Sequence, residues 1–275
     1  MRRALAMALL LCAQAAWAME PMSDSAMSAV RGRDGVSFDL SGFAMSGDAR
    51  VSYTTPVGSS LYEEKFAASR SDSAQPFSDP YRLDVLAGPP GLANYINIAF
   101  PANAAGEQRW QMAYDWGIGA DGVVREQGSV VVKDLAFYGG GLQFTTPQVN
   151  EGIAFGASVK LDIGQLAFQP QGRSDAPEAM LLSGIHIGGA DGGAWAIANV
   201  ASQPGVINAL TDELGPRLHI GIDWPDARYG SGQAPAGSIV VDNISFVSPG
   251  QPTVDLGSSR IGSVQIQYLD IKFKY

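Results

Sequence analysis

The sequence predicts an all-β, mostly antiparallel protein, a β-sandwich of the jelly-roll type with one or two short helices. Three observations lead to this prediction. A ten-residue strand pattern occurs twice, many short segments alternate apolar and polar residues, and the 275 residues include 33 glycines and 16 prolines, which favour turns. We expect a single β-rich domain over residues 36–275.

The repeated pattern occupies residues 128–137 and returns almost intact at residues 237–246. Each copy opens with small residues, continues through β-branched residues, crosses a polar pair and closes on an apolar residue two positions before an aromatic one, as strands do. Looser copies cover residues 157–168 and 262–273. A β-helix is the alternative architecture, but its coils would recur at a fixed period, and these copies are unevenly spaced. The spacing favours a sandwich.

The polar pair in the first copy, Lys133 and Asp134, predicts a β-bulge. Before the pair the valines occupy even positions, 130 and 132, whereas after it the apolar residues occupy odd positions, 135 and 137. Because side chains alternate between the two faces of a strand, one extra residue is needed to keep these positions on one face.

The first 18 residues have the features of a signal peptide. Arg2 and Arg3 precede a short apolar run at residues 4–16, and small residues flank Trp17 at the expected cleavage site after Ala18. The run is shorter than the ~20 residues that span a bilayer, so we expect no transmembrane helix after cleavage. We therefore expect export to the periplasm, the outer membrane or the cell surface. A lipoprotein is the rival interpretation. A lipobox, however, needs a small residue before the cysteine, and the residue before Cys12 is Leu11.

Charge and cysteine content exclude several classes. Loss of Arg2 and Arg3 lowers the basic residues from 18 to 16 against 27 acids, so the formal charge moves from −9 to −11. This balance opposes binding to nucleic acid, which requires Lys and Arg to neutralise phosphates, and binding to anionic lipid through a basic surface. The single cysteine, Cys12, lies in the leader, so the mature chain has no disulfide.

Residues 19–35 predict a short helical segment that Ser23 or Asp24 begins and Gly32 ends. The stretch carries a spaced pattern at Met22, Asp24, Met27, Ser28, Val30, Gly32 and Gly35. With this pattern it resembles the N-terminus of a family of Gram-negative exported proteins described as pilus-system (Fil-type) proteins. The resemblance implies an envelope address and brings no catalytic residues.

Apolar alternation predicts the remaining strands, which cover residues 36–40, 49–54, 81–86, 95–100, 110–116, 142–146, 180–187, 195–200 and 218–224. Two segments predict helix instead. Residues 61–68 place Tyr62 and Phe66 four apart, which favours one or two helical turns. Residues 205–214 carry an apolar side at positions 206, 207, 210 and 214, and Gly215-Pro216 would end that helix.

The densest aromatic stretch places Trp110, Met112, Tyr114 and Trp116 on one face of a strand. Exposed rings there would stack on sugars, which makes Trp110, Trp116 and Trp224 the candidate ligand-binding residues. Burial in the core is the structural interpretation of the same rings. Asp115 and Asp121 are too few ligands for a calcium site, and we predict no metal.

Two histidines remain after cleavage, His186 and His219. On adjacent strands with Asp223 nearby they would bind a metal or transfer protons, whereas on the outer face of a sheet they are ordinary polar residues. The sequence shows no cysteine nucleophile, no Gly-x-Ser-x-Gly motif and no phosphate-binding glycine loop. We predict no enzymatic activity and no cofactor.

Two further resemblances concern the C-terminal part. Residues 242–246 resemble the closing strand of jelly-roll carbohydrate-binding modules, which implies a two-sheet sandwich. Residues 269–275 alternate and end on Tyr275, as outer-membrane β-barrels do, but few segments show the ~10 residues of alternation that a spanning strand needs.

The sequence thus predicts a non-enzymatic structural or interaction protein of the envelope or cell surface, associated with a pilus-like system. Its expected partners are envelope or pilus-system proteins. A carbohydrate-binding β-sandwich module that binds glycans is one alternative, and an outer-membrane β-barrel is the other.

Overall fold

A computed structural model describes residues 35–72, 75–88, 93–147, 152–173, 178–213, 215–223, 233–266 and 268–270. Residues 35–275 belong to one compact unit. The predicted signal peptide, residues 19–34 of the helical segment and Trp224 lie outside the described residues.

The described residues form one sheet of 16 strands, and every strand pairing in it is antiparallel. The predicted all-β, antiparallel class is confirmed, and the pairing differs from the parallel coils of a β-helix. The strands are β1 (Val36–Phe38), β2 (Ala44–Ser46), β3 (Arg50–Thr54), β4 (Ser60–Arg70), β5 (Tyr81–Leu86), β6 (Tyr95–Ala99), β7 (Trp110–Ala120), β8 (Val123–Thr145), β9 (Ile153–Gln169), β10 (Ala179–Gly189), β11 (Trp195–Ala198), β12 (Gly205–Asp212), β13 (Gly215–Asp223), β14 (Gly237–Val247), β15 (Val254–Val264) and β16 (Tyr268–Asp270).

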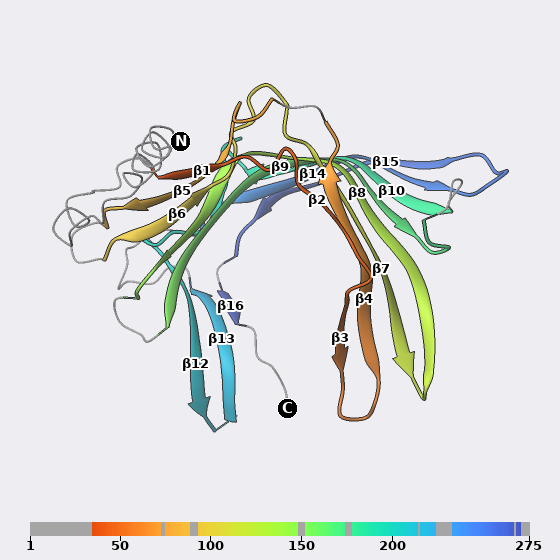
Figure 1. The fold of residues 1–275 in the computed structure, drawn as a ribbon, viewed down its shortest axis with the longest axis horizontal. Coiled ribbons are helices and arrows are strands. Elements are labelled where there is room, and N and C mark those ends of the chain that lie inside the picture. Colours follow the sequence, from red (N-terminus) through yellow and green to blue (C-terminus); the bar gives the residue numbers. More distant parts are fainter. Residues whose placement is uncertain are drawn as a thin grey trace, which may run out of the picture. The chain divides into compact units, whose positions relative to one another are not determined.

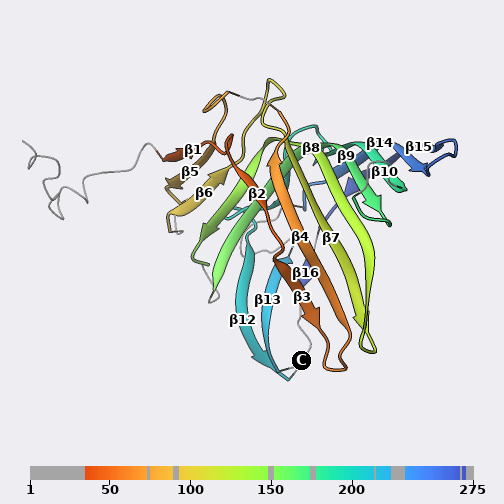
Figure 2. The ribbon, with the colours of Figure 1, turned by 45° about the vertical axis from the view of Figure 1, so that its right-hand side comes forward.

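Two long strands, β8 and β9, connect the parts of the sheet (Figure 1). The first part of β8 pairs with β7 and its last part with β6, while β9 follows it along the other edge. Strands β3, β4 and β7 and residues 123–133 of β8 lie side by side in both Figure 1 and Figure 2. We call these four segments the arm.

The helix predicted at residues 61–68 is wrong, because these residues belong to β4. Tyr62 and Glu64 are buried while Leu61 and Lys65 are exposed, which is the two-residue period of a strand. Strands β3 and β7 pair with β4 on its two sides and satisfy its backbone groups. A spacing of four residues fits both a helix and a strand, so tertiary pairing decided between them.

The helix predicted at residues 205–214 is also wrong. Residues 205–212 form β12, which makes a hairpin with β13 and also pairs with β9. Gly215 has a φ of 85° and closes the hairpin opposite Asp212 instead of ending a helix. The β-branched residues Val206 and Ile207 suit the strand.

The predicted bulge in the repeated segment is confirmed. Trp110 pairs with Leu135 and Met112 with Val132, so β8 has one extra residue there, and Asp134 adopts a φ of 55°. The second copy, in β14, also carries a register shift, between Val241 and Ile244. Both copies are therefore bulged at the same place in the pattern.

Each bulge has a glycine beside it on the neighbouring strand. A β carbon at Gly164 would come within 2.9 Å of the Asp134 side chain, and one at Gly184 within 2.3 Å of Asp242. A larger residue would collide with the aspartate, so glycine is needed at both places.

The core consists mainly of small side chains. Fully buried residues include Val200, Pro101 and Ser129, and Ala136, Ala154 and Ala167 are also buried. Several large apolar side chains of the strands are exposed instead. A sheet with this distribution keeps apolar surface available for binding.

Candidate functional site

Strand β7 carries the predicted row of aromatic and apolar residues, and cross-strand partners extend that row over the arm. Partners in register share a face of the sheet. In one row, Leu61 is the cross-strand partner of both Tyr53 and Ile118. In the next row on the same face, Glu63 is the partner of both Val51 and Trp116. We call this surface the apolar face: Met45, Val51, Tyr53, Leu61, Met112, Tyr114, Trp116 and Ile118.

The residues on this face of β7 differ in exposure. The Trp110 side chain is only 8% exposed. Its ring meets Phe43 edge-on at 6.1 Å and lies 5.5 Å from the guanidinium of Arg70. Trp116 is half-buried, and Ile118 is exposed. Of the predicted ligand-binding residues, Trp110 therefore lies in the core, Trp116 lies on the apolar face, and Trp224 is outside the described residues. Their role in binding stays a prediction.

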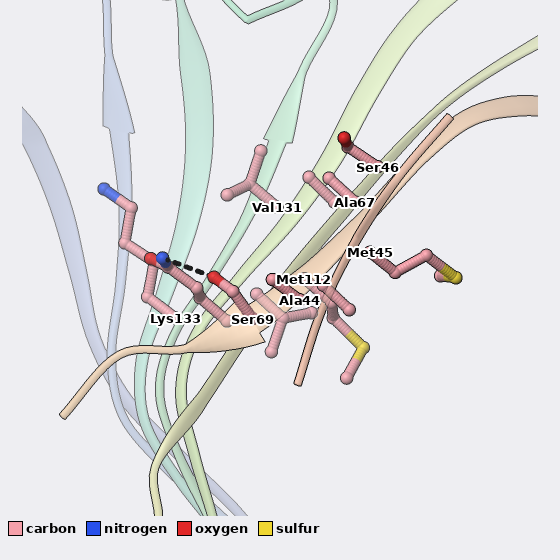
Figure 3. Close-up of a pocket in the computed structure, with 12 residues that line it drawn as sticks. Ala44, Met45, Ser46, Ala67, Ser69, Met112, Val131 and Lys133 are labelled. Atoms are coloured by element: carbon pink, nitrogen blue, oxygen red, sulfur yellow. Dashed lines mark hydrogen bonds between the residues drawn. The ribbon is translucent and has the colours of Figure 1, made fainter. Parts of the chain in front are cut away.

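A groove of about 390 Å³ lies where β2, β4, β7 and β8 meet. Its lining includes residues of both faces of the sheet. Met45, Ala68 and Met112 are in register on the apolar face, whereas Ala67, Ala113 and Val131 are in register on the opposite face. Figure 3 shows Met45 and Met112 beside the groove, with Ser69 and Lys133 at another part of its lining. The groove has a chiefly apolar lining contributed by four strands.

The opposite face of the arm is polar and joined by charges. Glu64 and Asp115 are cross-strand partners there. Arg50 donates a hydrogen bond of 2.8 Å to Glu64, and Arg173 donates one of 2.9 Å to Asp115. A bulge in β4, where Lys65 has a φ of 54°, places the Lys65 ammonium 3.2 Å from Asp115 and 3.6 Å from Glu64. We call Arg50, Glu64, Lys65, Asp115, Ser129 and Arg173 the polar network.

The polar network keeps Asp115 ionised. Burial alone would raise the pKa of Asp115, but the hydroxyl of Ser129, which donates a hydrogen bond of 2.6 Å, and the cations of Lys65 and Arg173 bring the pKa below its usual value. The hydrogen bond to Asp115 also raises the pKa of Lys65. A cavity of about 210 Å³ adjoins these carboxylates. Asp115 is suited to holding cations and not to donating a proton near neutral pH.

The two histidines are not on adjacent strands. His186 is in β10, which pairs with β9 and β14, whereas His219 is in β13, which pairs with β12 and β16. The His186 ring lies 2.7 Å from Asp162 and 3.5 Å from Asp242, so carboxylates of two neighbouring strands flank it. The hydrogen bond to Asp162 raises the pKa of His186. The alternative that places the two histidines side by side on adjacent strands therefore does not hold.

In the part of the chain that the structure describes, no three His, Cys, Asp or Glu side chains are grouped to hold a metal. None of the described segments is a helix long and apolar enough to cross a bilayer.

Sequence reasoning missed most of the apolar face and, apart from singling out Asp115, the whole polar network. The members of the network lie at residues 50, 64, 65, 115, 129 and 173, and no local motif connects them. Alternation at Val51 and Tyr53 was a usable signal, because it marks one face of a strand. What the sequence lacked was the identity of the neighbouring strands.

Comparison with known proteins finds one match. Residues 1–71 match the model of a family of unknown function (DUF6160). This range ends just after β4, so it includes Val51, Tyr53 and Leu61 of the apolar face. No curated protein and no solved structure is significantly similar to the chain.

Proposed function

We propose that this chain is a non-enzymatic, exported protein of the cell envelope or cell surface that works by binding another macromolecule through the apolar face. The observation that carries the proposal is the exposure of large side chains on one face of the arm, among them Val51, Tyr53 and Leu61. Exposed apolar residues scattered singly are ordinary, but a contiguous group is typical of a binding surface.

The sheet explains why this surface needs a partner. A sheet with one apolar face is stable when a second layer covers that face. The described strands form one sheet, and the arm has large apolar side chains open to solvent. A bound macromolecule would provide the missing layer.

Export and the association with a pilus-like system are supported by the sequence. Arg2 and Arg3, the short apolar run and the small residues before residue 19 favour cleavage and export. The resemblance of residues 22–35 to Fil-type proteins favours an envelope address. We therefore expect the partner to be an envelope protein.

A crosslinking experiment in the native cell tests this proposal. A photoreactive amino acid at Leu61 should capture an envelope protein. One at Asp191, an exposed turn residue after β10 and outside the arm, should not. Deletion of the gene should change surface appendages or adhesion. Unchanged appendages and attachment, together with no crosslink from Leu61, would contradict the proposal.

Carbohydrate binding is the second candidate function. The observation in its favour is that Trp116 and Tyr53 present aromatic rings on one open face, which suits stacking on sugars. A glycan array should then show binding that Trp116→Ala removes and that Trp110→Phe, a change in the core, leaves in place. An array without signal would eliminate this candidate.

A further inference from the structure

We propose that a second copy of this chain covers the apolar face, so that two arms pack face to face in a symmetric dimer. This inference rests on the proposed function, because it names the partner of the same surface. Each arm provides four strand segments, and two arms together make a two-layer sandwich.

The size of the open surface fits a dimer interface. Six members of the apolar face are exposed, from 37% at Met112 to 63% at Val51, while Tyr114 and Trp116 are half-buried. Given ~150–250 Å² for a large side chain, the open apolar area is roughly 600 Å², close to the ~800 Å² that each partner buries in a standard interface. Aromatic residues and methionine, which are enriched in interfaces, make up much of it.

The charges on the same face are self-complementary. Glu63 lies between Val51 and Trp116, and Arg125 is the cross-strand partner of Ile118. Because Glu63 is in register with Val51 and Trp116, its side chain lies on the apolar face. Burial raises the pKa of Tyr114 on this face, and the negative charge of Glu63 raises it further. Neither Glu63 nor Arg125 takes part in an ion pair within the described residues. In a twofold interface, the acid of each copy can pair with the base of the other copy, so one unpaired acid and one unpaired base on the same face suffice for two ion pairs.

The positions of these charges define the symmetry. Strands β4 and β8 flank β7, which separates Glu63 from Arg125 by about 10 Å across the sheet. A twofold axis midway between them passes over β7 near Ile118. It places Glu63 of each copy opposite Arg125 of the second copy, since an isologous interface makes each contact twice. A partner of uniformly acidic or basic surface would leave one of these charges opposed.

A charge-swap experiment tests the dimer. The full chain, expressed with its own leader and purified from the envelope, is analysed by sedimentation velocity between about 1 and 100 μM. Glu63→Arg or Arg125→Glu alone should weaken the dimer about tenfold or more, because each places like charges together. The double variant should regain the wild-type dissociation constant to within about threefold. Arg82→Glu, an exposed arginine in β5, is the matched control and should change nothing.

A crosslinking experiment tests the position of the axis. The chain's one cysteine, Cys12, lies in the leader, so an introduced cysteine is the sole thiol of the cleaved protein. Since packed sheets are about 10 Å apart, a short bismaleimide should join two copies through Ile118→Cys. Val254→Cys, an exposed residue of β15, is the control and should remain monomeric on a denaturing gel. Circular dichroism confirms that each variant is folded.

Three results would overturn the dimer. They are a wild-type monomer at about 100 μM, single charge variants as dimeric as the wild type, and a double variant as weak as either single variant. Leu61 crosslinking distinguishes this failure from that of the proposed function. A monomer that still crosslinks to a different envelope protein overturns the dimer and leaves the proposed function standing. A chain that dimerises but is not associated with the envelope supports the dimer and overturns the proposed function.

Discussion

The two faces of the arm are built by alternate residues of the same strands, yet they are completed in different ways. On the polar side, Glu64 bonds Arg50, and Asp115 bonds Ser129 and Arg173. On the apolar side, the neighbours Leu61 and Glu63 have no such partners among the described residues. One face is satisfied inside the chain, whereas the other leaves large apolar side chains open to solvent.

Sequence neighbours thus have different tasks. Glu63 and Glu64 are adjacent, but the strand turns the first towards the apolar face and the second into the polar network. The network connects residues from β3, β4, β7 and β8 with Arg173 after β9. Through Arg173, it connects the arm to the segment that follows β9. Stability and binding can therefore be altered separately, by choosing the face.

The largest expected effect is a difference in the free energy of unfolding between substitutions of Glu64 and of Glu63. Glu64→Ala should lower the free energy of unfolding by about 2 kcal/mol, because Glu64 is buried and its loss leaves Arg50 without its charged acceptor. Glu63→Ala should change it by no more than about 0.5 kcal/mol. Urea unfolding in the Arg125→Glu background, at protein concentrations where that variant is monomeric, measures both without a contribution from the dimer. Equal effects of the two substitutions would contradict the division of tasks.

A smaller effect is expected on the apolar face, and it concerns association. Leu61→Asp should weaken self-association about tenfold or more, since it places a charge in the centre of the interface, while the free energy of unfolding changes by less than about 1 kcal/mol. Val85→Asp replaces another exposed apolar residue, on β5, and is the matched control. Sedimentation velocity and urea unfolding measure the two quantities. If Val85→Asp weakened association as much, the apolar face would have no special role.

How much was predictable differs along the chain for a physical reason. The all-β class, the bulge at Asp134 and the shared face of Trp110 to Trp116 all follow from local alternation, which the sequence contains. The helices predicted at residues 61–68 and 205–214 were wrong because a four-residue spacing suits both periods, and pairing partners decided the outcome.

The site was less predictable than the fold. Alternation placed Trp110 and Trp116 on one face, but burial distinguishes them, and burial depends on Phe43 and Arg70 from other parts of the chain. The polar network depends likewise on which strands are neighbours and on Arg173, which reaches Asp115 from 58 residues away in the sequence. Contacts of that separation leave no local pattern.

The smallest expected effect is a dependence of stability on pH, which arises from Asp115 in the polar network. The pKa of Asp115 in the folded chain lies below its usual value of 3.8, so the folded state binds this proton less readily than the unfolded state. The stability that Asp115 contributes is therefore present above pH 3.8 and is lost as the pH falls through the lower folded pKa.

Thermal melting between pH 7 and pH 3 should show this loss in the wild type. Asp115→Asn, which keeps the shape and cannot ionise, should be less stable at pH 7 and should lose less stability on acidification. Asp191→Asn, at an exposed turn, is the control for general acid effects. If Asp115→Asn and the wild type lost stability in parallel, the polar network would not depend on the charge of Asp115, and the division between the two faces would rest on packing alone.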